Sequence, residues 1–196
     1  MDFFGIALAT FSLQLNVLLY IPEGKDKVPV SLFVLSQFIA TVSFFLDVSS
    51  FHFKKTTTTL RILSVSTFLL SVHFALLGEY TSGLMMMIAC CRFIIASITN
   101  NKKFFIFFML LSFFGCMFTW QSCKDVLPLL AGLIMNYAAF QKAEIKIRCY
   151  TMIGSAFWIV SNFIAHSPIA FSMELSFFFS TAFSLFKNIK SKDYAI

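Results

Sequence analysis

Long apolar runs separated by short polar breaks fill the chain. A membrane-spanning helix needs about 20 apolar residues, and eight runs reach or approach that length. They are residues 3–21, 30–49, 62–77, 83–99, 104–120, 126–140, 150–165 and 169–186. Inside lipid a backbone must satisfy its own hydrogen bonds, and a helix does so within one segment. The pattern therefore predicts an all-helical, polytopic transmembrane bundle.

The composition agrees with a membrane protein and excludes several other classes. Hydrophobic residues make up 59% of the 196 residues, charged residues only 12%, and 28 residues are Phe. A soluble domain of this size exposes too much surface to hide so many apolar side chains. The same numbers argue against a disordered chain, a disulfide-stapled secreted domain and a nucleic-acid binder. We expect a lipid bilayer around the chain and no nucleic-acid partner.

The positive charges are distributed unequally between the two sides that eight spans define. One side receives eleven cationic residues: Lys54, Lys55, Arg61, Lys102, Lys103, Lys142, Lys146, Arg148, Lys187, Lys190 and Lys192. The other receives three, which are Lys25, Lys27 and Lys124. Because cationic loops favour the cytoplasmic side, the carboxyl end is expected in the cytoplasm, with residues 191–196 as a short tail.

The first run differs from the others and is treated as a separate part, residues 1–29. Met1 and Asp2 provide no basic start, and the run lacks the small-residue cleavage pattern of a secretory signal. These features favour an extra, uncleaved span followed by a short loop. An interfacial helix, a cleaved leader and a misassigned start remain open alternatives. Residues 30–190 then form the main membrane domain with seven core spans.

Two parts of that domain resemble each other at an offset of 89 residues. Residues 68–74 (FLLSVHF) align with residues 157–163 (FWIVSNF), so that His73 and Asn162 become equivalent. Both segments precede a tight turn and another span. Because the offset contains an even number of spans, the two segments cross the membrane in the same direction. This predicts parallel repeats in a 3+1+3 arrangement. Such repeats are a known transporter plan, with the site at the repeat interface.

Several stretches also resemble a known family. They are 63–65 (LSV), 71–80 (SVHFALLGEY), Arg92, 126–132 (VLPLLAG), and 157–163 with Glu174 and Ser176. In these stretches, over roughly residues 31–190, the chain resembles the YgjV family of bacterial inner-membrane proteins. The resemblance implies the bacterial inner membrane as location. It also implies an architecture similar to SWEET and PQ-loop carriers, which are small-solute carriers of two three-helix repeats.

The chain departs from that more distant pattern at three positions. SWEET-like carriers use Asn in the fourth and eighth spans to hold their solute. The corresponding positions here are Ala89, Thr181 and Ser184. The resemblance therefore does not imply a sugar site of the usual kind.

Two ionisable residues inside apolar runs, Arg92 and Glu174, are candidates for function, because a charge at mid-membrane costs roughly 2.5–3.5 kcal/mol on insertion scales. They lie in runs related by the repeat, and one interpretation is a cross-repeat ion pair that gates a path or binds a charged solute. A purely structural pairing is another interpretation. The alternatives are a snorkelling Arg92 and a hydrated Glu174 near the interface. Asp47 is expected to form an interfacial ion pair with Lys54 or Lys55.

Further candidates lie on the runs around residues 73 and 158. Thr151, Ser155, Trp158 and Asn162 recur at steps of four, three and four and share one helical face. This stripe either lines a solute path or bonds neighbouring helices. His73 either relays protons or is a buried, hydrogen-bonded histidine. The predicted solute path consists of Arg92, Glu174, His73, Asn162, Trp158 and Ser155.

The sequence contains none of the enzyme or metal-binding motifs that we searched for. Hydrolase, metalloprotease, nucleotide-binding and dinucleotide-binding motifs are absent, and the five cysteines lack metal-ligand spacing. We therefore expect no enzyme, no catalytic residue, no cofactor and no metal. The favoured function is a carrier or facilitator of an unidentified small solute. The alternative is a non-transporting membrane protein that acts through partner subunits. The short run 126–140 leaves room for a homodimer.

Overall fold

The computed structural model describes residues 29–50, 53, 55–99, 103–141 and 143–193. This part is helical, as predicted. The helices are α2 (Val30–Ser50), α3 (Thr56–Leu76), α4 (Tyr80–Ile98), α5 (Lys103–Thr119), α6 (Val126–Ala139), α7 (Glu144–Ile164) and α8 (Pro168–Asp193), with a 3-10 turn at Cys123–Asp125. The run 3–21 lies outside the described residues.

Four of these helices are long and apolar enough to cross a membrane. They are α2, α4, the Thr57–Leu76 part of α3 and the Pro168–Phe186 part of α8, whereas α5 is a shorter apolar helix. Helices α3 and α7 both begin about six residues earlier than the apolar runs indicate. The first turns contain the threonines before Arg61 in α3, and Lys146 and Arg148 in α7. Helical backbone therefore extends beyond the apolar stretch, where polar side chains can reach water or lipid headgroups.

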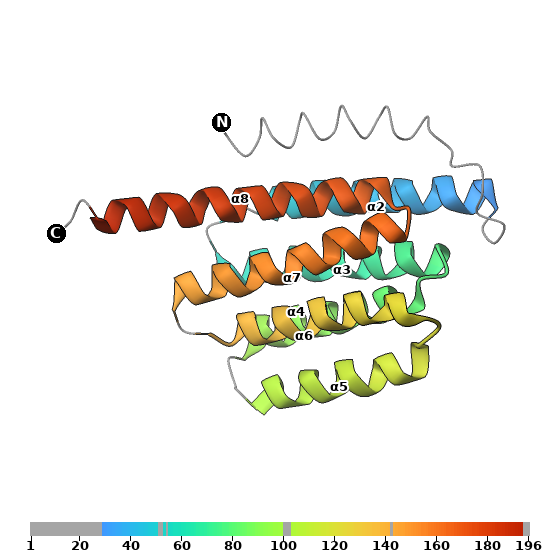
Figure 1. Cartoon of the computed structure of the whole chain (residues 1–196), viewed down its shortest axis with the longest axis horizontal. Coiled ribbons are helices and arrows are strands. Elements are labelled where there is room, and N and C mark those ends of the chain that lie inside the picture. Colours follow the sequence, from blue (N-terminus) through green and yellow to red (C-terminus); the bar gives the residue numbers. More distant parts are fainter. Residues whose placement is uncertain (1–28, 51–52, 54, 100–102, 142, 194–196) are drawn as a thin grey trace.

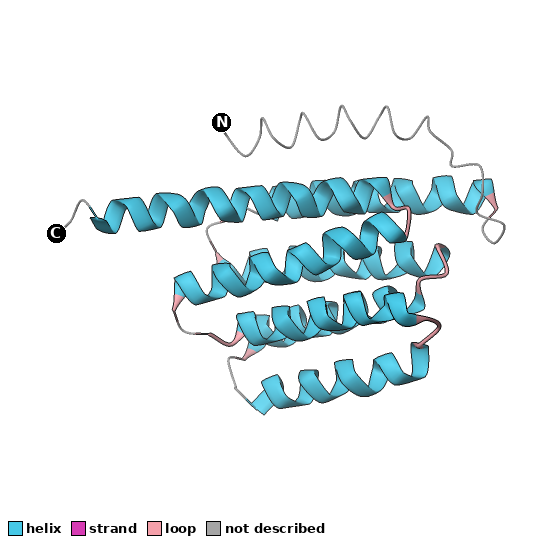
Figure 2. Cartoon of the chain, viewed as in Figure 1, coloured by secondary structure: helices cyan, strands magenta, loops and turns pink. Residues whose placement is uncertain are grey.

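The helices lie side by side and alternate in direction along the chain (Figures 1 and 2). Helix α3 packs most extensively against α2 and α4, and α7 packs most extensively against α6 and α8. We call α2–α4 the amino-terminal group and α6–α8 the carboxy-terminal group. The two groups meet where α4 contacts α6 and α2 contacts α8, and α5 lies at one edge between α4 and α6.

The bounds of α3 and α7 and the starts of α4 and α8 correspond at a shift of 88 residues. Helices α3 and α7 start at Thr56 and Glu144 and end at Leu76 and Ile164, and both have 21 residues. Helices α4 and α8 start at Tyr80 and Pro168, which are separated by the same shift. The alignment at 89 residues is therefore off by one position. One residue rotates a helix by about 100°, which explains how apolar sequences can match in the wrong register.

The turns that follow α3 and α7 have the same hydrogen-bond pattern. The amide of Glu79 donates to the carbonyl of Phe74, and the amide of Ser167 donates to the carbonyl of Asn162. A hydrogen bond between the first carbonyl and the sixth amide of such a segment is typical of a Schellman turn. This turn needs a residue with a left-handed backbone conformation just after the helix. Gly78 fills that position with φ 76°, and His166 fills it with φ 49°. In this register Asn162 corresponds to Phe74, so the predicted pairing of His73 with Asn162 is wrong.

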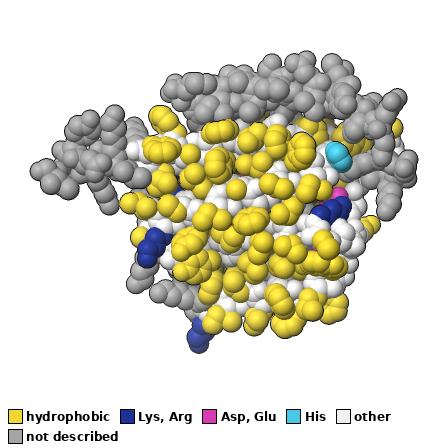
Figure 3. All heavy atoms as spheres, in the orientation of Figure 1, with side chains coloured by type: hydrophobic (Ala, Val, Ile, Leu, Met, Phe, Trp, Pro, Cys, Tyr) yellow, Lys and Arg dark blue, Asp and Glu magenta, His cyan; other side chains and the backbone are white. Residues whose placement is uncertain are grey.

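The outer surface is mainly apolar. Large side chains such as Phe118, Phe186 and Phe163 are exposed on three different helices. In the face shown in Figure 3, hydrophobic side chains cover the middle of the bundle and the charged side chains lie toward its ends. An exposed apolar belt of this kind fits contact with lipid tails rather than water.

Candidate functional site

The interior of the bundle is unusually polar for a membrane protein. Within the described α-helices, five buried side-chain atoms have no hydrogen-bond partner: Gln37 Oε1, Asp47 Oδ1, Arg92 Nε, Asn162 Oδ1 and Glu174 Oε2. Buried polar groups are normally satisfied, so unsatisfied ones are unusual and require explanation. They come from α2, α4, α7 and α8, and therefore from both three-helix groups. The candidate site is built from these residues and their neighbours.

Arg92 forms the basic part of the interior. Its side chain is 8% exposed, and its Nη1 donates to Oδ1 of Asn136 on α6. The Asn136 amide in turn donates to Ser112 Oγ at 3.2 Å and to the Phe108 carbonyl at 3.4 Å, both on α5. The Arg92 guanidinium also lies 5.2 Å from the ring centre of Phe93. This network joins α4, α5 and α6, and all the groups that contact Arg92 in it are neutral.

A small cavity lies beside this network. It has a volume of about 30 Å³, which accommodates on the order of two water molecules. Arg92, Asn136, Ser112 and Trp158 contribute to its lining. Its other walls are apolar: Met85, Met86, Ile88, Ala89, Gly132 and Met135. The cavity is too small for a sugar or a nucleoside in this conformation.

Two carboxylates form the acidic part of the interior. Asp47 on α2 is 5% exposed and Glu174 on α8 is 8% exposed. Each has one serine partner from its own group, Ser66 on α3 for Asp47 and Ser155 on α7 for Glu174. The negative charge of Asp47 also acts on Glu174 as a like charge. The two carboxylates come from opposite groups, on helices α2 and α8, which contact each other.

The structure corrects the predicted ion pairs. Arg92 and Glu174 do not pair with each other; Arg92 bonds to Asn136, and Glu174 bonds to Ser155. Arg92 is also buried rather than snorkelling. Asp47 has Ser66 as a side-chain partner. Lys55 is exposed, and the predicted pair of Asp47 with Lys54 lies outside the described residues.

Trp158 lies between the basic and acidic parts and connects the two groups. Its ring stacks on Phe74 of α3, with ring centres 5.8 Å apart and planes inclined by 24°. Trp158 lines the cavity next to Arg92, and Ser155, one turn earlier on α7, bonds to Glu174. Ser155, Trp158 and Asn162 are all buried, as the predicted stripe requires. Whether this stripe contacts a solute stays a prediction.

His73 connects the groups at the end of the bundle that contains Gly78. Its Nδ1 is 2.8 Å from the Ser36 carbonyl on α2, and its Nε2 is 2.8 Å from Ser167 Oγ at the start of α8. The side chain is completely buried. His73 therefore has the bonded, structural environment that was one of its two predicted interpretations.

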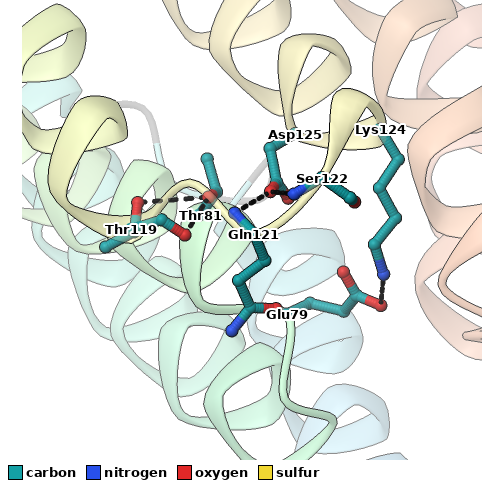
Figure 4. Close-up of polar contacts among 7 residues, drawn as sticks. All are labelled: Glu79, Thr81, Thr119, Gln121, Ser122, Lys124 and Asp125. Carbon is teal, nitrogen blue, oxygen red and sulfur yellow. Dashed lines mark hydrogen bonds and ion pairs between the residues drawn. The ribbon is translucent and has the colours of Figure 1, made fainter.

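A second connection lies at the same end, which we call the Gly78 end (Figure 4). Lys124, just before α6, forms an ion pair of 2.7 Å with Glu79, just before α4. The Asp125 carboxylate accepts the backbone N–H groups of Gln121 and Ser122 at 2.7 and 2.8 Å, which fixes the loop that holds Lys124. Thr81 Oγ1 donates to the Thr119 carbonyl at 3.0 Å and ties α4 to α5. The two groups are thus fastened together at the Gly78 end.

Sequence reasoning missed the bond of Asn136 to Arg92 and the placement of Asp47 and Glu174 on helices that contact each other. Asn136 is a single amide in an otherwise apolar run, and an amide in that setting needs a polar partner. That signal could have linked Asn136 to Arg92, the nearest unexplained charge. No comparable signal could have shown that α2 contacts α8, because that contact depends on how the two groups dock. Among the described residues no group of three or more potential metal ligands is present.

Comparison with known proteins agrees with this membrane architecture. A family model, Imp-YgjV, described as a bacterial inner membrane protein, matches residues 34–192. No curated protein and no solved structure matches the chain. The match covers every described helix apart from the first residues of α2 and the last of α8, and it excludes the run 3–21.

Proposed function

Because this chain belongs to the Imp-YgjV family of bacterial inner membrane proteins, we propose that it acts there as a carrier or facilitator of a small solute. The single observation that supports this proposal most is the burial of two carboxylates, Asp47 on α2 and Glu174 on α8, in helices that contact each other. Ionisable residues within membrane helices are costly and commonly mark ion or substrate pathways. Here each carboxylate also leaves one oxygen without a hydrogen-bond partner.

The proposed movement is a rocking of the two three-helix groups about the polar interior. Matching helix bounds and matching Schellman turns at a shift of 88 residues support a parallel 3+1+3 repeat. Carriers built from repeats expose a central site by moving one repeat against the other. The links through His73 and through Glu79 and Lys124 close the Gly78 end in the conformation described here. The small volume beside Arg92 fits a closed state that must open to admit a larger solute.

The proposal includes an orientation for the bundle. Lys55, Lys103 and Lys146 lie at the end opposite to Gly78, and cationic loops favour the cytoplasm. The Gly78 end then faces outward, and the carboxyl end lies in the cytoplasm. A reporter enzyme that works only in the cytoplasm should be active when fused after Ile196. Activity of a reporter that works only outside the cytoplasm would reverse the orientation.

Water access to the interior tests the carrier proposal without knowledge of the solute. We expect Ser155→Cys, in a chain whose five native cysteines are replaced, to react with a hydrophilic thiol reagent in open membranes. A thiol reacts as the thiolate, which forms in water and not in lipid. The matched control is Ile153→Cys, because Ile153 lies on the same helix but is 48% exposed on the outer surface. It should stay unlabelled.

The outcomes of this experiment separate the carrier from its rival. Labelling at position 155 but not at 153 supports an aqueous path through the interior. If neither position reacts in folded protein, the interior is sealed and the carrier proposal is wrong. The chain would then be a non-transporting membrane protein that acts through partner subunits.

A further inference from the structure

Arg92 is a buried cation that forms no ion pair with a carboxylate in the described part of the chain. Its bonded neighbour is the neutral Asn136, and its aromatic neighbour is Phe93. The ion pair of Glu79 with Lys124 lies far along α4 from Arg92. A charge removed from water without a partner of opposite sign is strongly unfavourable. Arg92 therefore needs compensation from something other than the side chains that contact it.

The hydrogen-bond donors at the cavity indicate that the missing partner of Arg92 is an anion. Arg92 Nε is buried and has no acceptor. The Ser112 oxygen accepts a bond from Asn136, which leaves the serine O–H proton available as a second donor. Both residues line the same cavity, and that lining contains no carboxylate. Donors without acceptors around a guanidinium are the arrangement that binds an anion.

The cavity limits the size of that anion. Its volume of about 30 Å³ accommodates a halide or a group of a few atoms such as a small carboxylate. The apolar walls, which include Met86 and Met135, exclude water and strengthen the attraction between the two charges. A multiply charged or bulky anion would not fit these limits.

We propose that the cavity beside Arg92 binds a small monovalent anion, with Arg92 as counter-charge and Ser112 as second donor. The claim that this anion is the transported solute rests on the proposed carrier function. The claim that the cavity binds the anion is tested by equilibrium binding, which requires no transport. A failure of binding therefore differs from a sealed interior in the thiol experiment.

Trp158 provides a probe inside the cavity. The chain has two tryptophans, and Trp120→Phe leaves Trp158 as the only one. Bromide quenches indole fluorescence on contact, so bromide held at Arg92 should quench Trp158. We expect a loss of fluorescence that saturates as bromide rises, at constant ionic strength set with gluconate. Chloride should reverse the loss by competition, whereas gluconate should not.

Variants of Arg92 show whether the guanidinium binds the bromide. In the Trp120→Phe background, Arg92→Gln should abolish the saturable loss, and Arg92→Lys should retain it with weaker binding. Arg61→Gln is the matched control, because it removes an exposed cation outside the cavity, and it should bind bromide like the parent. Quenching of the parent that rises linearly with bromide, or that chloride does not reverse, would overturn the proposal even if Arg92→Gln fails to fold.

Discussion

Replacement of Asn136 by Leu is expected to lower the free energy of unfolding by about 3 kcal/mol. The change removes the acceptor of Arg92 and leaves a buried guanidinium without its hydrogen-bonded partner, which costs about 1.5–3 kcal/mol for the bond to a charged group and more for the stranded charge. It also removes the donor to Ser112 and Phe108. Denaturant titration of the detergent-solubilised protein measures this loss.

The double variant Arg92→Met with Asn136→Leu separates the stranded charge from the packing change. It should be more stable than Asn136→Leu alone, because an apolar pair replaces the buried charge. Gln141→Leu is the matched control, since Gln141 follows α6 and its side chain donates to the carbonyl of Tyr137, one turn earlier. An Asn136→Leu variant as stable as the Gln141→Leu variant would contradict the role of this network.

Replacement of His73 by Ala is expected to lower the free energy of unfolding by about 3 kcal/mol. It creates a cavity in a fully buried position and removes two bonds, one to α2 and one to Ser167. His73→Phe keeps most of the volume and should recover only the packing part of the loss. The same denaturant titration measures all variants.

His166 offers a matched control for His73. It is exposed, and its backbone amide donates to the carbonyl of Phe163 within the turn. We expect His166→Ala to change stability by no more than about 0.5 kcal/mol. Equal losses for His73→Ala and His166→Ala would show that His73 does not fasten α3 to α8.

The helices could be predicted from the sequence because lipid leaves few alternatives for an apolar backbone. Their starts were less predictable. The threonines before Arg61 and the residues around Lys146 are polar, yet α3 and α7 include them. The repeat was recognisable, but its register was not. The shared Schellman turn sets the register, and a glycine in one turn and a histidine in the other hide that equivalence in the sequence.

The candidate site was predictable as a set of residues but not as a set of contacts. Arg92, Glu174, His73, Asn162, Trp158 and Ser155 are all buried in the interior, and whether they line a path stays a prediction. Their partners depend on docking between the groups. Opposite charge favours a bond between Arg92 and Glu174, yet the fold gives Arg92 an amide from α6 and gives Glu174 a serine from α7.

The central claim is that the two three-helix groups move and expose one interior to both sides of the membrane. Sided labelling of Ser155→Cys tests it most directly. Right-side-out and inverted membrane vesicles, both sealed, are treated with a thiol reagent that cannot cross the bilayer. The account predicts labelling of Ser155→Cys from each side and labelling of Ile153→Cys from neither. Labelling of Ser155→Cys from neither side would contradict the claim.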